Sequence, residues 1–493
     1  MIDRDDVVAN AKYLRNVRPI DPEEICDYVS GHPHPAVVRQ VLREEALGLG
    51  LVERDDGTFV PASDEPVRTG VDEVRAFPDE YAAELEDLLV ERYGYDWATG
   101  DTGDELRETV RRLKDDYYQR RPVEYDADVA LGYAVYHLPD FYAAVQYVLN
   151  DLVAKQLLPR TLRILDVGAG VGGPALGVHD YLPDDALVDY HAVEPSAATE
   201  VLDDLLDVTG PNFHHEIHET TAEAFDPDGE YDVVLFANVL NELDDPEAVV
   251  RRYVPFLADD GSVVALAPAD RNTSIGLRRV ERAIVDDPAD RSTGDSTPRR
   301  PTVYAPTVRL WPNAAPTDEG WSFDVRPDLD VPPFQRRLDD GARPEPTSTA
   351  DGADTAGEFV NVDVQFSYSI LRLDGARILD VTPSPSTYAR MADMEQHVSN
   401  RIDLLAVKLS RNLASTDPAT DANPLFKVSD GSETADNYAV LVQQTAGNRN
   451  LLEADYGDLL AFDGVLALWN DDESAYNLVV DETTVVDRIP RPV

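Results

Sequence analysis

The residues with the clearest chemical meaning form a glycine-rich turn after a short apolar run. Ile164–Val167 has the composition of a buried strand, glycines stand at positions 168, 170, 172 and 173, and Pro174 suits the first turn of a helix. Because glycine has no Cβ, this turn can approach a ligand closely, and the amino end of the helix adds a positive dipole. The sequence therefore predicts a ligand site at this turn.

Two classes of ligand bind to such turns, and one residue separates them. The spacing Gly168-x-Gly170-x-x-Gly173 fits the fingerprint for the pyrophosphate of a dinucleotide, whereas Asp166-x-Gly168-x-Gly170-x-Gly172 resembles the S-adenosylmethionine (SAM) pattern of class I methyltransferases. A carboxylate at Asp166 suits the cationic methionine end of SAM and would repel a pyrophosphate. Glu194 ends the next predicted strand and would hold ribose hydroxyls in either class, so it does not decide between them. We therefore favour SAM.

Polar residues after the fourth predicted strand are a second feature in favour of SAM. Asn238 and Asn241 stand where that strand ends, and ligands of open α/β sheets bind at the carboxyl ends of the strands. We predict that both asparagines lie near the transferred methyl group, as the catalytic residues. The residues predicted to bind the cofactor are Asp166, Gly168, Ala169, Gly170, Gly172, Glu194 and Asn238.

An alternation of strands and helices must position these residues. Residues 161–375 contain apolar, strand-like runs separated by helix-like segments, which predicts a doubly wound, mostly parallel α/β sheet of the Rossmann-like kind. Segments 286–301 and 339–357 are rich in Pro, Ser, Thr, Asp and Gly, so we expect loop insertions there. The clearest strand runs are Ile164–Val167, Leu187–Val193, Tyr231–Phe236, Ser262–Leu266 and Val362–Leu373.

Two segments before this core have different patterns. Residues 1–62 carry three helix-like stretches and a hairpin, which is the order of a winged helix, although a small helical cap with a hairpin has the same pattern. Residues 65–160 are mostly helical. We predict a winged-helix-like domain followed by a helical domain.

The last segment, residues 398–493, is predicted to be all-β. Five strand-like runs with turn signals between them resemble an OB-fold barrel, which often binds single-stranded nucleic acid through stacked aromatic rings. The candidate aromatics are Phe426, Tyr438, Trp469 and Tyr476, and core or rim positions are the commoner role for such residues. The runs are Ile402–Leu409, Leu425–Val428, Tyr438–Val442, Leu459–Leu468 and Tyr476–Val486.

Beyond the glycine turn, several elements resemble one particular family. Asn238-Val-Leu-Asn-Glu-Leu243 is similar to the signature of the methyltransferase-like proteins of the small ribosomal subunit, known from the mitochondrial small-subunit assembly factor and its bacterial and archaeal relatives. Tyr133–Tyr142 resembles the family's Tyr-x-x-Tyr-Arg-Leu-Pro-Ala-Thr-Tyr element, Val364–Leu371 its Lys-Phe-Ser-Tyr strand, and Asp455–Asp458 its Trp-Gly-Asp step. The resemblance implies a SAM-binding protein that acts on small-subunit ribosomal RNA or in the assembly of that subunit.

The chain departs from this family where the family binds an iron–sulfur cluster. Members typically place cysteines in Ala-Pro-Cys-Pro-His and Trp-Cys-His-Phe contexts, and these fall here on Ala305-Pro306-Thr307 and Trp321-Ser322-Phe323. Cys26 is the only cysteine, which excludes intramolecular disulfides and any cluster or zinc site held by this chain's own cysteines. We therefore expect no iron–sulfur cluster, and a region held by packing instead.

Histidines and arginines form two further groups of interest. His214, His215 and His218 flank Glu216 but miss the zinc-helix spacing by one residue. On a strand, His214 and His218 would be about 13 Å apart at ~3.3 Å per residue, so we interpret these histidines as structural and expect no metal. Segment 271–300 holds seven Arg and five acidic residues, and its Arg278, Arg279 and Arg282 either face phosphates or pair with neighbouring acids.

The composition says more about the solvent than about partners. The formal net charge is −52, and only five of the 43 basic residues are Lys. Pervasive acidity with few lysines resembles the proteins of a halophilic archaeon, where molar salt shortens the Debye length to about 3 Å and screens self-repulsion. The charge therefore does not exclude nucleic acid. The acidic amino terminus and the lack of an apolar run of about 18 residues lead us to expect a cytoplasmic protein without membrane association.

Three functions stay open at this point. The first is a SAM-dependent methyltransferase-like protein that acts on small-subunit ribosomal RNA or in the biogenesis of that subunit. The second is a methyltransferase of a protein or a small molecule. The third is a non-catalytic RNA-binding assembly factor with a structural SAM site, which the lack of a convincing general base among the candidate residues permits.

Overall fold

The computed structural model describes residues 3–119, 121, 123, 125–286, 300–342, 357–414 and 422–490, with residues 117 and 118 described for their backbone alone. Most of the two predicted insertions, residues 287–299 and 343–356, lies outside these ranges. The chain divides into two compact units. Unit 1 comprises Met1–Ala237 and Pro327–Val364, and unit 2 comprises Asn238–Arg326 and Gln365–Val493.

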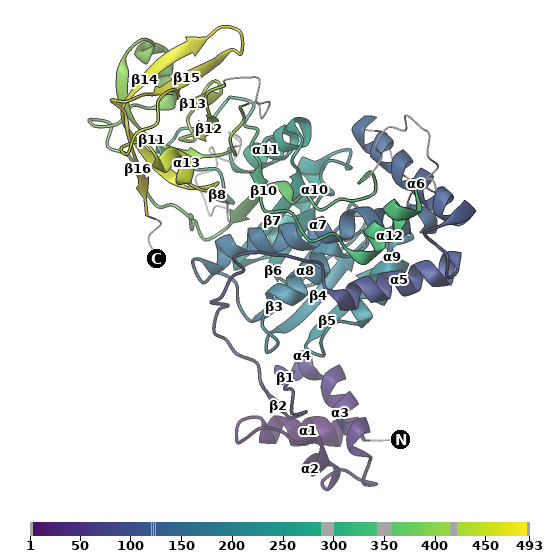
Figure 1. Cartoon of the computed structure of the whole chain (residues 1–493). Coiled ribbons are helices and arrows are strands. Elements are labelled where there is room, and N and C mark those ends of the chain that lie inside the picture. Colours follow the sequence, from purple (N-terminus) through teal and green to yellow (C-terminus); the bar gives the residue numbers. More distant parts are fainter. Residues whose placement is uncertain are drawn as a thin grey trace. The chain divides into compact units, whose positions relative to one another are not determined.

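Unit 1 begins with a small helical domain that ends in a hairpin (Figure 1). The Asp21 carboxylate accepts a hydrogen bond from the Glu23 backbone N–H, and Pro22 takes the first helical position, so α2 begins where its sequence predicts. Four helices precede the hairpin, where three were predicted for residues 1–62, and the short α4 is the additional one. The elements are α1 (Arg4–Leu14), α2 (Pro22–Cys26), α3 (Pro35–Glu44), α4 (Ala46–Leu49), β1 (Leu51–Glu53) and β2 (Phe59–Pro61).

Four further helices of unit 1 comprise three that follow one another in the sequence and one, α12, from a much later segment. They are α5 (Asp79–Tyr93), α6 (Gly100–Gln119), α7 (Ala127–Val153) and α12 (Pro333–Gly341). Helix α7 is buried over most of its length and contains Pro139. Helix α12 corrects the start of the predicted insertion 339–357, because Asp339–Gly341 form the last turn of this helix.

The parallel strands of unit 1 lie in the order β5-β4-β3-β6 (Figure 1). They are β3 (Thr161–Val167), β4 (Leu187–Val193), β5 (Phe213–His218) and β6 (Tyr231–Ala237). Helix α8 (Gly173–Tyr181) follows β3, and α9 (Ala198–Asp207) follows β4. Residues 219–230, which connect β5 to β6 and are all described, form turns and no helix.

Helix α8 approaches α7 so closely that one position between them must be glycine. A Cβ on Gly177 would lie 2.4 Å from the backbone oxygen of Tyr142 and 2.5 Å from Cγ1 of Val145. A backbone oxygen cannot move aside as a side-chain end can, so the close helix contact depends on Gly177.

Unit 2 contains the antiparallel strands of the core and the helices beside them. Strand β10 pairs antiparallel with β7, β8 and β9. The elements are α10 (Pro246–Tyr253), β7 (Leu257–Pro268), α11 (Arg271–Val285), β8 (Thr302–Ala305), β9 (Asp324–Val325) and β10 (Gln365–Arg372). Short 3₁₀ helices span Val254–Phe256 and Met391–His397.

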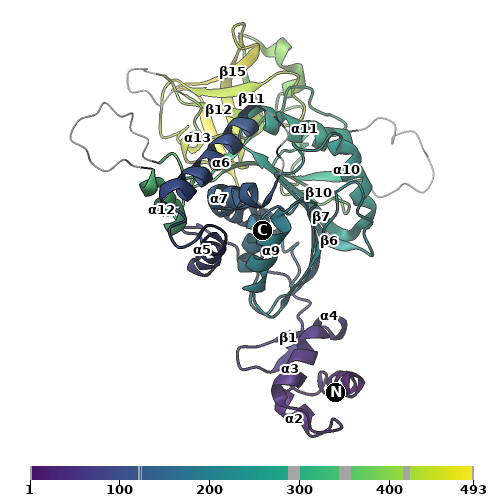
Figure 2. The same cartoon turned by 90° about the vertical axis from the view of Figure 1, so that its right-hand side faces the viewer.

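The carboxyl-terminal part of unit 2 is a closed, five-stranded, OB-like barrel, as predicted (Figure 2). The strands run in the order β11-β12-β13-β15-β14, β14 pairs back with β11, and the β13–β15 pair is parallel. The elements are β11 (Arg401–Lys408), β12 (Leu425–Ser429), β13 (Asn437–Leu441), α13 (Asn450–Glu453), β14 (Leu459–Asn470), β15 (Ala475–Val480) and β16 (Val485–Ile489).

Two expectations about this barrel need correction or refinement. The predicted strand Tyr476–Val486 is broken at Asp481–Thr484, because the Asp481 side chain accepts the Thr483 backbone N–H in a tight turn; β15 and β16 are separate strands. Of the candidate stacking aromatics, Phe426 and Tyr476 lie in the barrel core, whereas Trp469 is 39% exposed.

Among the described helices, none is long and apolar enough to cross a membrane.

Candidate functional site

The glycine turn after β3 is tied to the end of β4. The backbone N–H groups of Gly168 and Ala169 both donate to the carbonyl oxygen of Val193, at 2.8 and 3.2 Å. Gly170 and Gly172 have φ angles of 54° and 93°, which favour glycine. A Cβ on Gly172 would lie 2.7 Å from Cδ1 of Leu202, so this glycine serves packing as well as backbone conformation.

Glu194 directs its carboxylate at this turn. Its Oε2 accepts the backbone N–H of Gly170 at 3.0 Å, and its Oε1 accepts the backbone N–H of Ser196 at 3.0 Å. Its own backbone N–H donates to the carbonyl of His218 at 3.1 Å. The side chain predicted to end the second strand therefore faces the turn, and its orientation is fixed by two neighbouring backbone groups.

Asp166 lies beneath the turn and is fully buried. The hydroxyl of Tyr190 donates to its Oδ2 at 2.6 Å, whereas its Oδ1 has no hydrogen-bond partner among the described residues. Burial raises the pKa of the Asp166 carboxyl to about 7, the Tyr190 hydrogen bond opposes this, and the Glu194 charge adds to it. A buried carboxylate oxygen without a partner is unfavourable, and a cationic ligand group would satisfy it.

The space above the turn is open on the side of Gly170. A Cβ on Gly170 would meet no heavy atom within 4 Å. Helix α8 begins directly after this turn, and its amino-terminal N–H groups receive no side-chain cap. These observations fit a ligand that carries a carboxylate for the helix end, a cation for Asp166 and hydroxyls for Glu194.

The two predicted catalytic asparagines belong to unit 2. Asn238 directly follows the last residue of β6, is buried, and has a φ of 62°, which places it in the left-handed region. Its backbone N–H donates to the carbonyl of Leu266 in β7 at 3.0 Å. Asn241 is exposed in the same turn. Their assignment to the methyl group rests on the sequence alone.

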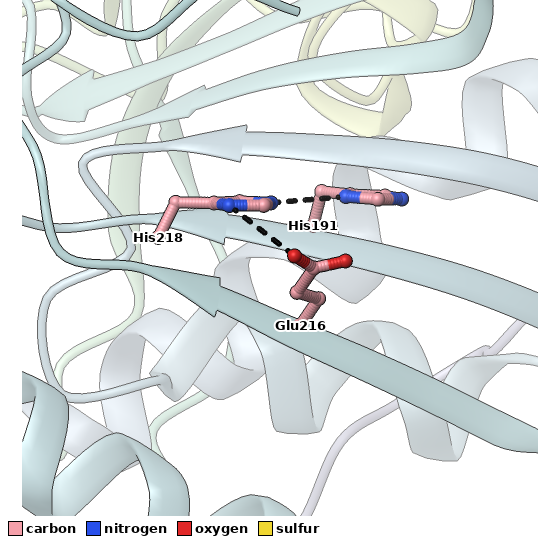
Figure 3. Close-up of side chains that lie close together, drawn as sticks. All are labelled: His191, Glu216 and His218. Carbon is pink, nitrogen blue, oxygen red and sulfur yellow. Dashed lines mark hydrogen bonds and ion pairs between the residues drawn. The ribbon is translucent and has the colours of Figure 1, made fainter. Parts of the chain in front are cut away.

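The structure brings together histidines that sequence spacing keeps apart (Figure 3). His191 Nδ1 on β4 lies 3.0 Å from His218 Nε2 on β5, with the two ring planes 3° apart. Glu216 Oε1 lies 3.6 Å from His218 Nδ1. Sequence reasoning considered only the histidines of β5 and missed His191, because its neighbourhood arises from the pairing of β4 with β5.

For two of the three arginines singled out in segment 271–300, the structure agrees with pairing to acids rather than with a surface that faces phosphates. Arg278 is buried and pairs with Glu281, and it also donates to the Tyr368 carbonyl. Arg282 pairs with Asp318. Only Arg279 is exposed, so Arg278 and Arg282 connect parts of unit 2 rather than face phosphates.

The positions that align with cysteines of the resembling family are hydrogen-bonded into the same network. Thr307 Oγ1 donates to Glu281 Oε1 at 2.9 Å, and the Ser322 hydroxyl lies 3.0 Å from that of Tyr456. Although burial by itself raises the pKa of Glu281, the charges of Arg278 and Arg309 lower it overall. The sequence analysis expected packing to hold this region. The structure adds a buried network of ion pairs and hydrogen bonds around Glu281.

Family models match three parts of the chain. Residues 141–293 match the model described as "Methyltransferase domain". Residues 4–55 and 392–489 match the amino-terminal and carboxyl-terminal domains of "Domain of unknown function (DUF8157)". No curated protein sequence matches the chain.

Solved structures similar to the chain include several methyltransferases. The plantazolicin methyltransferase BpumL in complex with SAH is 16% identical, with 41% of this chain and 66% of that chain covered and a TM-score of 0.24. The DhpI–SAH complex is 19% identical, with 23% and 52% covered and a TM-score of 0.19. A SAM dependent methyltransferase from Aquifex aeolicus is 14% identical, with 22% and 56% covered and a TM-score of 0.20. The matches span about half to two thirds of these proteins.

The parallel sheet, the glycine turn and the matched family model together define the class of the core. It has the Rossmann-like α/β fold of class I SAM-dependent methyltransferases. A carboxyl-terminal OB-like barrel accompanies this methyltransferase domain in the same chain.

Proposed function

We propose that the chain binds SAM at the glycine turn and acts as a methyltransferase-like protein on small-subunit ribosomal RNA or in the assembly of that subunit. The observation that carries the SAM site is the Glu194 carboxylate on the Gly170 amide, beside an open turn. The unpartnered Asp166 Oδ1 supports a ligand with a positive charge rather than a pyrophosphate.

Each residue of the turn has a defined task in this proposal. A carboxylate has about four acceptor positions, and Glu194 uses two for backbone N–H groups, so two remain for ribose hydroxyls. Asp166 Oδ1 accepts the ligand's ammonium group, and Gly168, Ala169 and Gly170 provide close backbone approach. SAM supplies a methyl group on a positively charged sulfur, and the chain contributes orientation and electrostatics. We assign Asn238 and Asn241 to the methyl group from their place in the sequence.

The proposed substrate class rests on the family resemblance and on the accessory domains. The OB-like barrel presents Trp469 with 39% of its surface exposed, which suits stacking on an unpaired base. The formal net charge of −52 on the whole chain opposes the binding of nucleic acid in dilute buffer, but molar salt screens this repulsion. We therefore place the activity, and the partner subunit, in a salt-rich cytoplasm.

A non-catalytic assembly factor with a structural SAM site is the second candidate. It is favoured by the side chains predicted near the methyl group, since the amides of Asn238 and Asn241 cannot act as general bases at neutral pH. In that case SAM binding persists and no methyl group is transferred.

Calorimetric titration of SAM into the full chain in molar KCl tests the site. Wild type binds SAM, and Gly170→Arg, whose side chain fills the open space above the turn, loses binding by more than about a hundredfold. The control Gly170→Ala adds a Cβ that meets nothing and retains most of the affinity, with the strain of a positive φ as its cost of about 1 kcal/mol. No binding by folded wild type would overturn the proposal.

Two further experiments address the substrate. Co-sedimentation with small ribosomal particles at high salt tests both functions that involve the small ribosomal subunit. A methyltransferase of another protein or of a small molecule would not co-sediment. Mapping of methyl groups on ribosomal RNA from a deletion strain then separates catalysis from assembly: a missing methyl group supports the enzyme, and unchanged methylation with a subunit-assembly defect supports the second candidate.

A further inference from the structure

One face of β4 and β5 carries a row of polar side chains that the SAM site does not use. The parallel register pairs Asp189 with His214 and His191 with Glu216, and His218 follows two residues later on the same face. The β5–β6 connection has no helix to cover this face. His191 is buried, whereas the Glu216 side chain is 65% exposed, so the group can be reached from solvent on the Glu216 side.

Three of these side chains could bind one metal ion together. One ligand atom from each of His191, Glu216 and His218 can be chosen so that all lie within 4.8 Å of one another. The two imidazole nitrogens are 3.0 Å apart, close to the ~3.3 Å that two ligands at ~2.05 Å from a tetrahedral zinc ion require.

Two charged groups face the other ring nitrogen of His191. Asp189 Oδ1 lies 3.1 Å from His191 Nε2 and can accept a proton from it, whereas the Arg163 guanidinium lies 3.0 Å from the same nitrogen and can only donate. Metal binding through Nδ1 requires the tautomer in which Nε2 donates to Asp189. Histidine ligands of metal ions typically donate their other N–H to such a carboxylate. Asp189 is itself held by the Arg163 guanidinium at 2.8 Å.

The charges around the group leave room for a divalent cation. Arg163 lies 3.0 Å from His191 Nε2, but it also pairs with Asp189 and with Asp228. With Glu216 included, one positive and three negative side chains give a sum of 1 − 3 = −2. A divalent ion would bring this sum to zero.

We infer that His191, Glu216 and His218 form a binding site for a divalent transition-metal ion of the zinc type, separate from the SAM turn. The rings are coplanar with their nitrogens facing each other, so binding tilts the partly exposed His218 ring and swings Glu216 inward (Figure 3). Two imidazoles and one carboxylate are a familiar zinc ligand set with a fourth position for water. The ion joins β4 to β5 beside the His218 carbonyl that holds the Glu194 backbone.

Titration of Co²⁺ into the chelator-treated full chain tests this site, because four-coordinate cobalt has intense visible absorption. Wild type takes up one Co²⁺ with this absorption, and Zn²⁺ displaces it. His191→Asn and His218→Asn each weaken binding at least tenfold, and Asp189→Asn weakens it about 10–100-fold through the lost support of His191. His215→Asn, on the same strand but outside the group, is the matched control and binds like wild type.

Folding is monitored separately from metal binding. Glu216→Gln changes an exposed side chain, so this variant folds and still weakens Co²⁺ binding. Zn²⁺ raises the unfolding temperature of wild type and of His215→Asn by more than that of Glu216→Gln. Folded wild type that binds no Co²⁺ or Zn²⁺, or variants at His191 and His218 that bind as wild type does, would overturn the inference.

Discussion

The Tyr190 hydroxyl reaches across from β4 and donates a 2.6 Å hydrogen bond to Oδ2 of Asp166 on β3. This bond fixes one oxygen of a fully buried carboxyl and leaves Oδ1 without a partner among the described residues. The carboxyl is therefore held in place at the glycine turn before any ligand arrives. Its protonation state decides how well a cation is received.

The affinity for SAM should depend on the protonation of Asp166. Burial raises the pKa of this carboxyl to about 7, so it is mostly neutral below that pH and ionised above it. A cationic ligand favours the ionised form, so affinity rises as pH rises through 7, by up to about tenfold per pH unit below 7. Calorimetry between pH 5.5 and 7.5 measures the trend, with proton release seen in buffers of different ionisation enthalpy.

Asp166→Asn is the matched control for this profile. The amide cannot ionise, so its weaker binding should not vary over the same pH range. The raised pKa also means that free wild type loses stability as pH rises from about 4 to about 7, because the folded state holds this proton more tightly than the unfolded state. A flat affinity profile for wild type would contradict the role given to Asp166.

Glu194→Gln should weaken SAM binding by about 1.5–3 kcal/mol, which is roughly 10–150-fold. The substitution removes the charge and replaces one acceptor with an NH₂ group that faces a backbone N–H of Gly170 or Ser196. Glu200→Gln, an exposed carboxylate on α9, is the control and binds normally. Equal affinities of the two variants in calorimetry would remove Glu194 from the site.

Gly177→Ala should destabilise the fold by about 1–3 kcal/mol, because its Cβ would lie 2.4 Å from the backbone oxygen of Tyr142. Gly276→Ala on α11 is the paired control, since its Cβ would meet nothing within 4 Å. Alanine there favours the helix, so this variant gains up to about 1 kcal/mol. Denaturant unfolding measures the free energy of unfolding of both variants. If Gly276→Ala is destabilised and Gly177→Ala is not, the close α7–α8 contact does not depend on Gly177.

Glu281→Gln should destabilise unit 2 by about 3–5 kcal/mol, because it leaves the buried Arg278 guanidinium without a counter-charge. Thr307→Val removes one hydrogen bond to Glu281 and should cost about 1–2 kcal/mol. Since the pKa of Glu281 is lowered in the fold, its contribution is present above the usual carboxyl pKa and is lost as pH falls. Unfolding midpoints in molar KCl provide the measurement; equal midpoints for wild type and Glu281→Gln would contradict it.

Stability should rise steadily with KCl, because a formal net charge of −52 repels itself in dilute buffer. The Debye length falls from about 10 Å at 0.1 M to about 3 Å at 1 M salt, which screens most of this repulsion. A neutral osmolyte at matching osmolality is the control. If the osmolyte stabilises the chain as much as KCl does, charge screening is not the cause.

The sequence predicted those parts of the fold whose pattern is local. The run before Gly168 has the apolar pattern of a buried strand, and β3 spans Thr161–Val167. The barrel strands appeared as separate apolar runs, and in the structure the pairing of β11 with β14 closes them into a barrel. The prediction of one last strand, Tyr476–Val486, was wrong because the turn at Asp481 lies inside an otherwise strand-like run. Glu194 directly follows β4 and its side chain accepts the Gly170 N–H, so its position next to the glycine turn could be inferred from the strand pattern.

Contacts that depend on tertiary pairing could not be predicted from local pattern. Tyr190 has the composition of an ordinary core residue, and only the pairing of β3 with β4 brings its hydroxyl to Asp166. Likewise His191 meets His218 through the β4–β5 register. The sequence could not decide whether Arg278 faces phosphates or pairs with acids, because one of its partners, the Tyr368 carbonyl, lies 90 positions away.

The network around Glu281 has a consequence for how unit 2 responds to mutation. Thr307, Ser322 and Arg278 join segments that lie far apart in the sequence through side-chain hydrogen bonds, and Arg278 also forms a buried ion pair with Glu281. A change at any one of these side chains therefore leaves a buried partner in a different segment unsatisfied, and its cost is felt at a distance along the chain.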